Sequence, residues 1–297
     1  MSEPRVGRVR ATAFSKVTLS LRVLGTRPDG FHELEALTVS VGQPHDTLEA
    51  VAVPHAGVSL ELDGDDVMVP AGDDNLAVRA AQELLLSVGR AGHGVQLVLR
   101  KRIPSARGLG GGSADAAAAL LAVRRLLEVD IDEPRLHALA ARLGSDVPFC
   151  LTGGAAWMRG RGEELEPAPL PVGIPMLLAL APFQIPTPEV YKAWDELGGP
   201  RSRRVIRAPR PVADVLPELV NDLEPAAEAV EPRLRPFRER LEDAVGRPAL
   251  LAGSGSAYIV LADGPRGLPD LAQQLSLKIG APIAASATVS RAVRVES

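Results

Sequence analysis

Apolar and polar residues alternate along the first third of the chain in the manner of β-strands. Apolar side chains recur at every second position over much of 9–24, and again from Gly94 to Arg100. Two further strand-like stretches lie near 46–53 and 57–62. A turn at Arg27-Pro28-Asp29-Gly30 follows the first strand, because Asp-Gly tolerates positive φ. We therefore predict that this part contains a half-buried sheet.

Helical periodicity fills the spaces between these strands. Asn75 is a good N-cap for a helix whose apolar residues recur at every third or fourth position. An Ala-rich helix is expected at about 113–128, and another at about 134–143 that ends near Gly144. Prolines cluster between 167 and 217, which indicates loops or a domain joint.

The second half has a mixed pattern of strands and helices. We expect strands at 176–181, 249–252, 257–262 and 288–295, and helices at about 212–220, 232–244 and 268–279. Neither half shows the regular alternation of a doubly wound parallel sheet, so we predict the α+β class in both. The expected division is an N-terminal domain over 1–158 and a C-terminal domain over 159–297.

Composition narrows the classes of function. The chain has 297 residues, a net charge of −4 and 3% aromatic residues. So few aromatics and a mildly acidic balance argue against binding a nucleic-acid polymer. No apolar run reaches the roughly 18 residues of a membrane span, and no apolar signal segment follows the N-terminus. We expect a cytoplasmic protein without a membrane partner, either a monomer or a weak homodimer.

Cysteine and histidine are too sparse to suggest a metal centre of their own. The single cysteine, Cys150, stands in an apolar run and is expected to be a buried, inert thiol. The five histidines lack metal-type spacing. The basic segment 201–210 is read as a solvated loop, with contact to an anionic substrate as a weaker alternative.

The strongest chemical signal is the run Arg107-Gly108-Leu109-Gly110-Gly111-Gly112-Ser113-Ala114, between a strand and the Ala-rich helix. Glycines let backbone N–H groups converge, and a helix N-terminus adds unpaired donors, so the run favours binding of a polyphosphate. It lacks the Lys-Ser/Thr ending of a Walker A loop, and Ser113 stands where the dinucleotide fingerprint requires glycine. The alternative is a flexible turn with Ser113 as an ordinary N-cap.

Further blocks surround this loop in a fixed order along the chain. They are Ser15-Lys16-Val17, Gly25 to Leu34, Asp74 to Ala80, Leu143 to Phe149, Gly160-Arg161-Gly162-Glu163, Pro186 to Tyr191, Asn221 to Glu224 and Gly253 to Ser256. With the glycine loop, they resemble the GHMP small-molecule kinases. Within that family they are most similar to members whose alcohol substrate carries a cytidine diphosphate group.

The resemblance implies a two-domain fold, with an N-terminal domain like ribosomal protein S5 domain 2 and a ferredoxin-like C-terminal domain. It implies ATP as phosphoryl donor with Mg²⁺, and an active site in the cleft between the domains. Asp146 would be the general base, and Lys16 would pair with it and contact the reacting oxygens. Without the resemblance, Asp146 reads as a solvated residue and Lys16 as an edge-strand charge.

The resemblance also implies the residues that bind each substrate. ATP would contact the glycine loop and two residues outside it: Pro104, Ser105, Ala106, Arg107, Gly108, Leu109, Gly110, Gly111, Gly112, Ser113, Ala114, Asn75 and Lys101. Ser113 is also the loop hydroxyl that we nominate as a metal contact. The alternatives for Asn75 and Lys101 are a helix cap and a strand-end charge.

The cytidine-bearing substrate would be held by aromatic and polar residues. Phe31 and Tyr191 would stack on the two faces of the cytosine, His32 would contact its polar edge, and Thr18 and Thr187 are further contacts. Thr18 stands where the family usually has Asn, and Phe31 where it usually has Tyr. Ser105-Ala106-Arg107 replaces a more glycine-rich entry to the loop, and Arg107 is expected to bind phosphate through its guanidinium.

Two other functions remain open from the sequence. One is a GHMP-type kinase of another alcohol, such as a sugar, homoserine or mevalonate; the Phe31-His32 block and Tyr191 argue against it. The other is a non-catalytic sensor of a nucleotide or sugar with the same fold. The presence of both Lys16 and Asp146 argues against the sensor.

Overall fold

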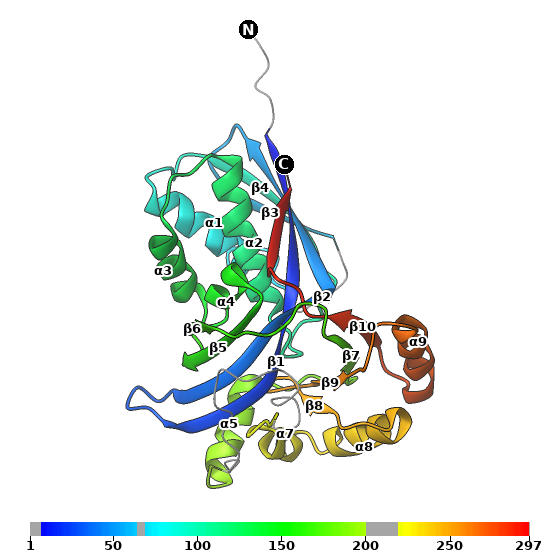
Figure 1. The fold of residues 1–297 in the computed structure, drawn as a ribbon. Coiled ribbons are helices and arrows are strands. Elements are labelled where there is room, and N and C mark those ends of the chain that lie inside the picture. The colour runs from blue at the N-terminus through cyan, green and yellow to red at the C-terminus, as the bar shows by residue number, and fades with distance from the viewer. Residues whose placement is uncertain (1–6, 64–68, 200–218, 297) are drawn as a thin grey trace.

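The computed structural model describes residues 7–63, 69–199 and 219–296. Its upper part in Figure 1 is a large sheet with helices packed on one face, and its lower part is a smaller sheet with further helices. The mixed order of strands and helices confirms the predicted α+β class. No described helix has both the length and the apolar character needed to cross a membrane.

The larger sheet is built around two long antiparallel strands, β1 and β2. Its central order is β11-β1-β2-β4-β3, and β5 joins β2 and carries β6. The strands are β1 (Arg8–Thr26), β2 (His32–Val53), β3 (Gly57–Asp63), β4 (Gly94–Arg100), β5 (Ala155–Gly160), β6 (Glu164–Pro167) and β11 (Val293–Glu296). Apart from β3, which runs parallel to β4, the pairings are antiparallel.

Four of the described helices belong to the larger sheet's part of the molecule. They are α1 (Leu76–Ser87), α2 (Gly111–Leu126), α3 (Glu133–Leu143) and α4 (Val147–Thr152). Asn75 caps α1 as predicted, since its side chain accepts a 2.9 Å hydrogen bond from the N–H of Ala77. Helix α2 is buried along most of its length. Its alanines let the helix lie close to the sheet, which fixes the place of the loop that precedes it.

The smaller sheet has the order β10-β7-β9-β8. Its strands are β7 (Pro175–Leu180), β8 (Leu250–Leu251), β9 (Ala257–Leu261) and β10 (Ile283–Ala287). The described helices of this part are α5 (Thr187–Glu196), α7 (Glu224–Val230), α8 (Leu234–Val245) and α9 (Leu268–Ile279).

Several elements differ from the sequence predictions. The strand expected at 288–295 is confirmed only over its last part, because β11 begins at Val293 and pairs with β1 of the larger sheet. The preceding strand, β10, ends at Ala287 and was not predicted. The structure also contains α4, α5, α7, β5 and β6, which the periodicity did not indicate, because each is short or follows a proline. The basic segment 201–210 and most of the helix expected at 212–220 lie outside the described residues.

The expected division at 158/159 falls inside β5, and β11 returns from the chain's end to the larger sheet. The division into two domains at that position therefore stays a prediction.

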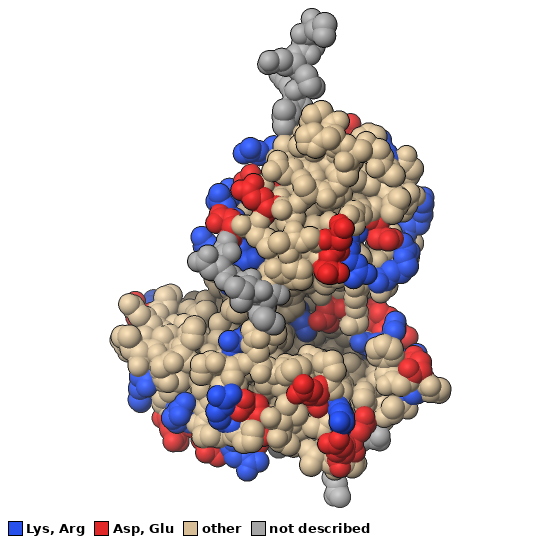
Figure 2. Space-filling view, turned by 180° about the vertical axis from the view of Figure 1, so that it is seen from behind, with Lys and Arg blue, Asp and Glu red and all other residues tan. Residues whose placement is uncertain are grey.

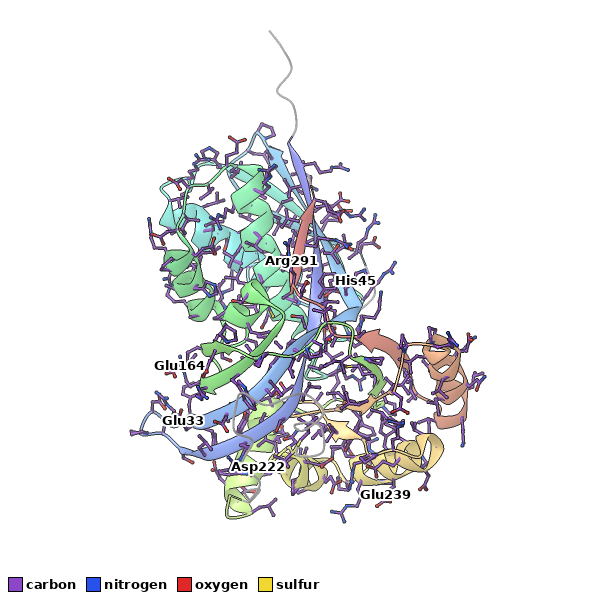
Figure 3. All side chains as sticks on the ribbon, in the orientation of Figure 1. Glu33, His45, Glu164, Asp222, Glu239 and Arg291 are labelled. Carbon is purple, nitrogen blue, oxygen red and sulfur yellow. The ribbon has the colours of Figure 1, made fainter. Side chains whose placement is uncertain are left out.

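Asp222, labelled in Figure 3, joins β1 to the lower part of the molecule. Its carboxylate accepts a 3.1 Å hydrogen bond from the N–H of Val23, and its own N–H donates to the carbonyl of Leu21 at 2.9 Å. Nearby, Asn221 donates from its side-chain amide to the carbonyls of Leu251 and Gly253. These bonds hold β1 beside the loop that follows β8. The upper and lower parts of the molecule therefore meet along β1.

Candidate active site

A cavity of about 850 Å³ lies where the two parts of the molecule meet. Figure 2 shows the surface hollowed between the upper and lower parts. The walls come from β1, β2, the glycine loop, the segment before α4, helix α5 and the turn at Gly253 and Ser254. Among the described residues, four cationic and two acidic residues line it: Lys16, Arg107, Arg161, Lys192, Asp146 and Asp195. This excess of positive charge suits an anionic ligand.

The glycine loop forms one wall through residues 104–113. Gly108 and Gly110 adopt φ of 77° and 68°, the left-handed region that favours glycine. A Cβ on Gly108 would lie 2.5 Å from the carbonyl oxygen of Ala252, so this position also requires glycine for space. Ala106 adopts φ of 53° although it carries a Cβ, so the loop is strained at its entry.

Helix α2 begins directly after this loop. Its N-cap, Gly110, has no side chain to bond the first-turn N–H groups. Gly111, Gly112 and Ser113 of that turn line the cavity. The helix therefore offers backbone donors and the positive end of its dipole to a ligand there. Ala114 is buried behind the turn and is not among the lining residues that the structure describes.

Lys16 and Asp146 form an ion pair at the cavity wall. Lys16 Nζ lies 3.1 Å from Asp146 Oδ2, and the lysine side chain is 10% exposed against 32% for the aspartate. The N–H of Lys16 donates to the carbonyl of Leu109 at 3.0 Å, which fastens β1 to the glycine loop. Asp146 is placed by the short helix α4, which begins at the next residue. The two predicted catalytic residues thus lie together, beside the phosphate-type loop.

Arg107 joins the glycine loop to the lower part of the molecule. Its Nη1 donates to the carbonyl of Phe183 at 2.6 Å and lies 3.3 Å from the hydroxyl of Ser256. The carbonyl of Phe183 also accepts from that hydroxyl. Arg107 is among the residues that line the cavity. Its expected phosphate contact stays a prediction, and these bonds give the guanidinium a second role in fixing the loop.

Lys101 lies beneath the glycine loop rather than in the cavity. Its ammonium contacts the carboxylates of Asp46 and of Asp115, the latter at 2.6 Å, and all three side chains are nearly inaccessible. The N–H groups of Arg102 and Ile103 also donate to Asp46. A Cβ on Gly111 would lie 3.3 Å from the Lys101 ammonium. This buried cluster therefore ties β2, the end of β4 and the start of α2 together.

Burial is the largest single influence on the ionisation of Asp115. It raises the pKa of Asp115 to about 8, because the attraction of Lys101 is opposed by the negative charge of Asp46. Burial lowers the pKa of Lys101, but the two carboxylates outweigh that effect and the net shift is upward. Asp115 is thus largely protonated near neutral pH, which limits the charge buried around the Lys101 ammonium.

The described cavity lining includes Leu76, but not Asn75 or Lys101. Asn75 caps α1 and donates to the carbonyl of Pro70 at 2.8 Å. Direct contact of either residue with ATP stays a prediction. The sequence analysis did not identify Asp46 or Asp115 as site residues. Asp115 lies inside the Ala-rich run 114–119, and an acid in such a buried helix needs a polar partner, so this position was a usable signal.

The residues expected to hold cytidine also line the cavity. Phe31 is 53% exposed at the tip of the β1–β2 hairpin, and the guanidinium of Arg161 lies 4.8 Å from its ring centre. Thr18 Oγ1 lies 3.3 Å from the hydroxyl of Thr38, and Thr187 Oγ1 lies 2.7 Å from that of Ser254. Both threonines line the cavity. Arg161 belongs to the block Gly160-Arg161-Gly162-Glu163, but the sequence indicated no binding role for it.

His32 and Tyr191 are in contact with each other. Their ring centres are 4.8 Å apart with the planes inclined by 27°, so His32 covers one face of the tyrosine. His32 Nε2 also lies 3.0 Å from Asp195 Oδ1. Burial raises the pKa of Tyr191 above its usual range, so its hydroxyl stays protonated. The two-faced clamp of Phe31 and Tyr191 stays a prediction, and Asp195 is a cavity residue that the sequence did not indicate.

No cluster of three His, Cys, Asp or Glu side chains that could hold a metal occurs among the described residues. Ser113 lines the cavity at the start of α2, beside the position suited to phosphate. Mg²⁺ keeps several waters and is bound largely by substrate phosphates, so a wall with a hydroxyl and few carboxylates fits that ion. Cys150 is buried, as predicted.

Comparison with known proteins agrees with this geometry. The family model "GHMP kinases N terminal domain" matches residues 75–154. The 4-diphosphocytidyl-2-C-methyl-D-erythritol kinase of Pelotomaculum thermopropionicum is 42% identical, over 83% of this chain and 86% of its own. A crystal structure of 4-(cytidine 5'-diphospho)-2C-methyl-D-erythritol kinase is 36% identical with a TM-score of 0.75, and covers 94% of this chain and 98% of that one.

A homoserine kinase from Cytophaga hutchinsonii is 18% identical with a TM-score of 0.72, over 100% of this chain and 99% of its own. That likeness concerns the fold alone, and it agrees with a two-domain GHMP kinase fold. The identity over most of the chain narrows the relationship further: the chain belongs to the GHMP kinases and, among them, to the 4-diphosphocytidyl-2-C-methyl-D-erythritol kinase family.

Proposed function

We propose that the protein transfers the γ-phosphoryl group of ATP to the 2-hydroxyl of 4-diphosphocytidyl-2-C-methyl-D-erythritol, giving the 2-phosphate and ADP. The reaction belongs to the methylerythritol phosphate route to isoprenoid precursors. The observation that carries the proposal is the ion pair of Lys16 and Asp146, in which Nζ lies 3.1 Å from Oδ2. This pair lies beside the glycine loop that precedes the buried helix α2. Family membership supplies the substrate.

Asp146 is the proposed general base. A carboxylate on the cavity wall can accept the proton of a substrate hydroxyl that lies within hydrogen-bond reach. Lys16 is held by its backbone bond to Leu109, so its ammonium is fixed near both the base and the loop. There it can stabilise the negative charge that develops on the transferring phosphoryl group.

The glycine loop is the proposed site for the ATP phosphates. Support comes from the uncapped first turn of α2 and from the glycines at 108 and 110, which have no Cβ to obstruct a ligand. Mg²⁺ would be held mainly by the phosphates and water, with the Ser113 hydroxyl as a protein ligand. When bound, it neutralises charge on the phosphates. A cytoplasmic location and a monomer or weak homodimer remain predictions.

The test of this function is ADP release coupled to a reporter enzyme. The diphosphocytidyl substrate is compared with homoserine, mevalonate and a panel of sugars. We expect turnover with the first substrate alone. Turnover with another alcohol instead would favour a different GHMP-type kinase, and nucleotide binding without turnover on any alcohol would favour a sensor.

Asp146→Asn tests the base. Asparagine keeps the size of the side chain but is a far weaker proton acceptor, so we expect kcat to fall at least a hundredfold, within the range of general-base effects. Binding of ATP, measured by calorimetry, should change little. Unchanged kcat would remove Asp146 as the base.

A further inference from the structure

Helix α5 holds the ring of His32 on three sides. Tyr191 stacks on it at 4.8 Å, Trp194 meets it edge-on at 5.5 Å with the planes at 90°, and Asp195 Oδ1 lies 3.0 Å from its Nε2. Positions 191, 194 and 195 are three and four residues apart, so they share one face of the helix. The histidine side chain is 10% exposed, whereas that of Asp195 is 47% exposed.

This contact decides which ring nitrogen carries a proton. An ionised carboxylate can only accept a hydrogen bond, so Nε2 of His32 is the donor to Asp195. In the neutral ring, Nδ1 is then an acceptor. Among the described residues, Nδ1 has no hydrogen-bond partner, although His32 lines the cavity. Thr26 on β1 also reaches Asp195 Oδ1, at 3.5 Å, and so supports the carboxylate from the hairpin.

A fixed acceptor discriminates between pyrimidine bases. Cytosine presents an exocyclic amino group, which donates, whereas uracil presents a carbonyl oxygen at the same position, which only accepts. An acceptor at Nδ1 can accept a hydrogen bond from the amino group of cytosine. Facing the carbonyl oxygen of uracil, the same nitrogen would meet a second acceptor and form no bond. A histidine free to exchange its tautomer would lose this preference, because either nitrogen could then donate.

We propose that Asp195 is a positioning residue that keeps the His32 proton on Nε2 and thereby makes the site select cytosine over uracil. The inference rests on the proposed function, in that His32 meets the base of a cytidine-bearing substrate. Its basis is the 3.0 Å contact together with the rings of Tyr191 and Trp194, which pack against the imidazole. The carboxylate itself touches the histidine, not the reacting atoms.

A role in stability alone does not account for this contact. Asp195 is about half exposed, and exposed ion pairs contribute little to stability. Replacing Asp195 should therefore leave the fold intact, so an effect on selectivity can be measured in a folded protein. Glu189 provides a matched control, because it lies on the same helix, is exposed and is not among the described cavity residues.

The experiment measures CMP and UMP binding by calorimetry for the wild type, Asp195→Ala, Asp195→Asn and Glu189→Gln. We expect the wild type and Glu189→Gln to prefer CMP, and Asp195→Ala to lose about tenfold of that preference, the effect of one hydrogen bond. Asp195→Asn keeps a carbonyl acceptor and should recover part of it. In parallel, ¹⁵N NMR of the His32 ring should show the Nε2–H form in the wild type and a mixture in Asp195→Ala.

The outcomes separate the two ideas. If the wild type binds CMP no better than UMP, the cytidine substrate of the proposed function and the selectivity device both fail. If the wild type prefers CMP and Asp195→Ala keeps the same ratio, the proposed function stands and the inference is overturned. An equal loss of CMP and UMP affinity would also overturn it, since that result indicates a purely structural role.

Discussion

Lys101 is the positive charge between two buried carboxylates, and its removal tests how the glycine loop is supported. The side-chain exposures are 6% for Lys101, 0% for Asp46 and 3% for Asp115. Lys101→Met keeps the length and the apolar stem but deletes the ammonium. Removing one partner of a buried ion pair costs about 3–5 kcal/mol, because the remaining charge has no compensation.

The two carboxylates share that loss unequally. Burial already raises the pKa of Asp115 to about 8, so Asp115 can stay protonated when the lysine is gone. Asp46 keeps the N–H groups of Arg102 and Ile103 as donors but loses its counter-charge. Asp115→Asn is the matched control: it preserves the shape and an acceptor for Lys101, so we expect a loss below about 1 kcal/mol.

The assay is urea unfolding followed by tryptophan fluorescence. Trp157 lies on β5 of the larger sheet and Trp194 on α5, so Trp194→Phe leaves a reporter of the part that contains the cluster. We expect the unfolding free energy reported by Trp157 to fall by about 3–5 kcal/mol in Lys101→Met. A loss below about 1 kcal/mol, with a raised KM for ATP, would refute the reasoning and indicate that Lys101 binds the nucleotide directly.

The same cluster predicts a pH dependence. Asp115 has a folded pKa of about 8 against an ordinary value of 3.8, because burial disfavours its ionised form. The stability that the protonated Asp115 side chain contributes is therefore fully present below the ordinary pKa of 3.8. This contribution is lost as the pH rises through the folded pKa of about 8. Between pH 6 and 9 the wild type should lose more stability than Asp115→Asn. Equal losses would contradict the assignment.

Two further predictions concern single side chains. Arg107→Ala removes the bonds to Phe183 and Ser256, so we expect a loss of about 1–3 kcal/mol in stability and a several-fold rise in the KM for ATP, measured by thermal unfolding and steady-state kinetics. An unchanged melting temperature would contradict a stabilising role for the Arg107 bonds to Phe183 and Ser256. Burial raises the pKa of the Cys150 thiol, so an aromatic disulfide reagent should label it in urea but not in the native protein; rapid native labelling would contradict this.

Local patterns in the sequence predicted much of the framework. The alternation over 94–100 became β4, and Asn75 caps α1 because its side chain can reach an N–H two residues ahead. The glycine loop and the helix after it were readable because glycine and alanine have strong conformational preferences of their own. The family blocks then indicated Lys16 and Asp146, which the structure brings to 3.1 Å.

Other features depend on contacts between distant segments. The partners of Lys101 lie 55 and 14 residues away, so a strand-end lysine could not be distinguished from a phosphate ligand by its neighbours in sequence. The contact between His32 and Asp195 spans 163 residues. β11 pairs with β1 across nearly the whole chain, and no periodicity indicates which sheet a short strand will join.

The sequence by itself determined the α+β class, the polyphosphate-type loop and the family, because these rest on short-range conformational preferences and on ordered blocks of residues. Only the tertiary structure decided that Arg107 bonds to the lower part of the molecule, that Lys101 is buried between Asp46 and Asp115, and that helix α5 holds His32. The physical reason is that a charged side chain takes its role from its burial and its partners, which chain folding alone brings together.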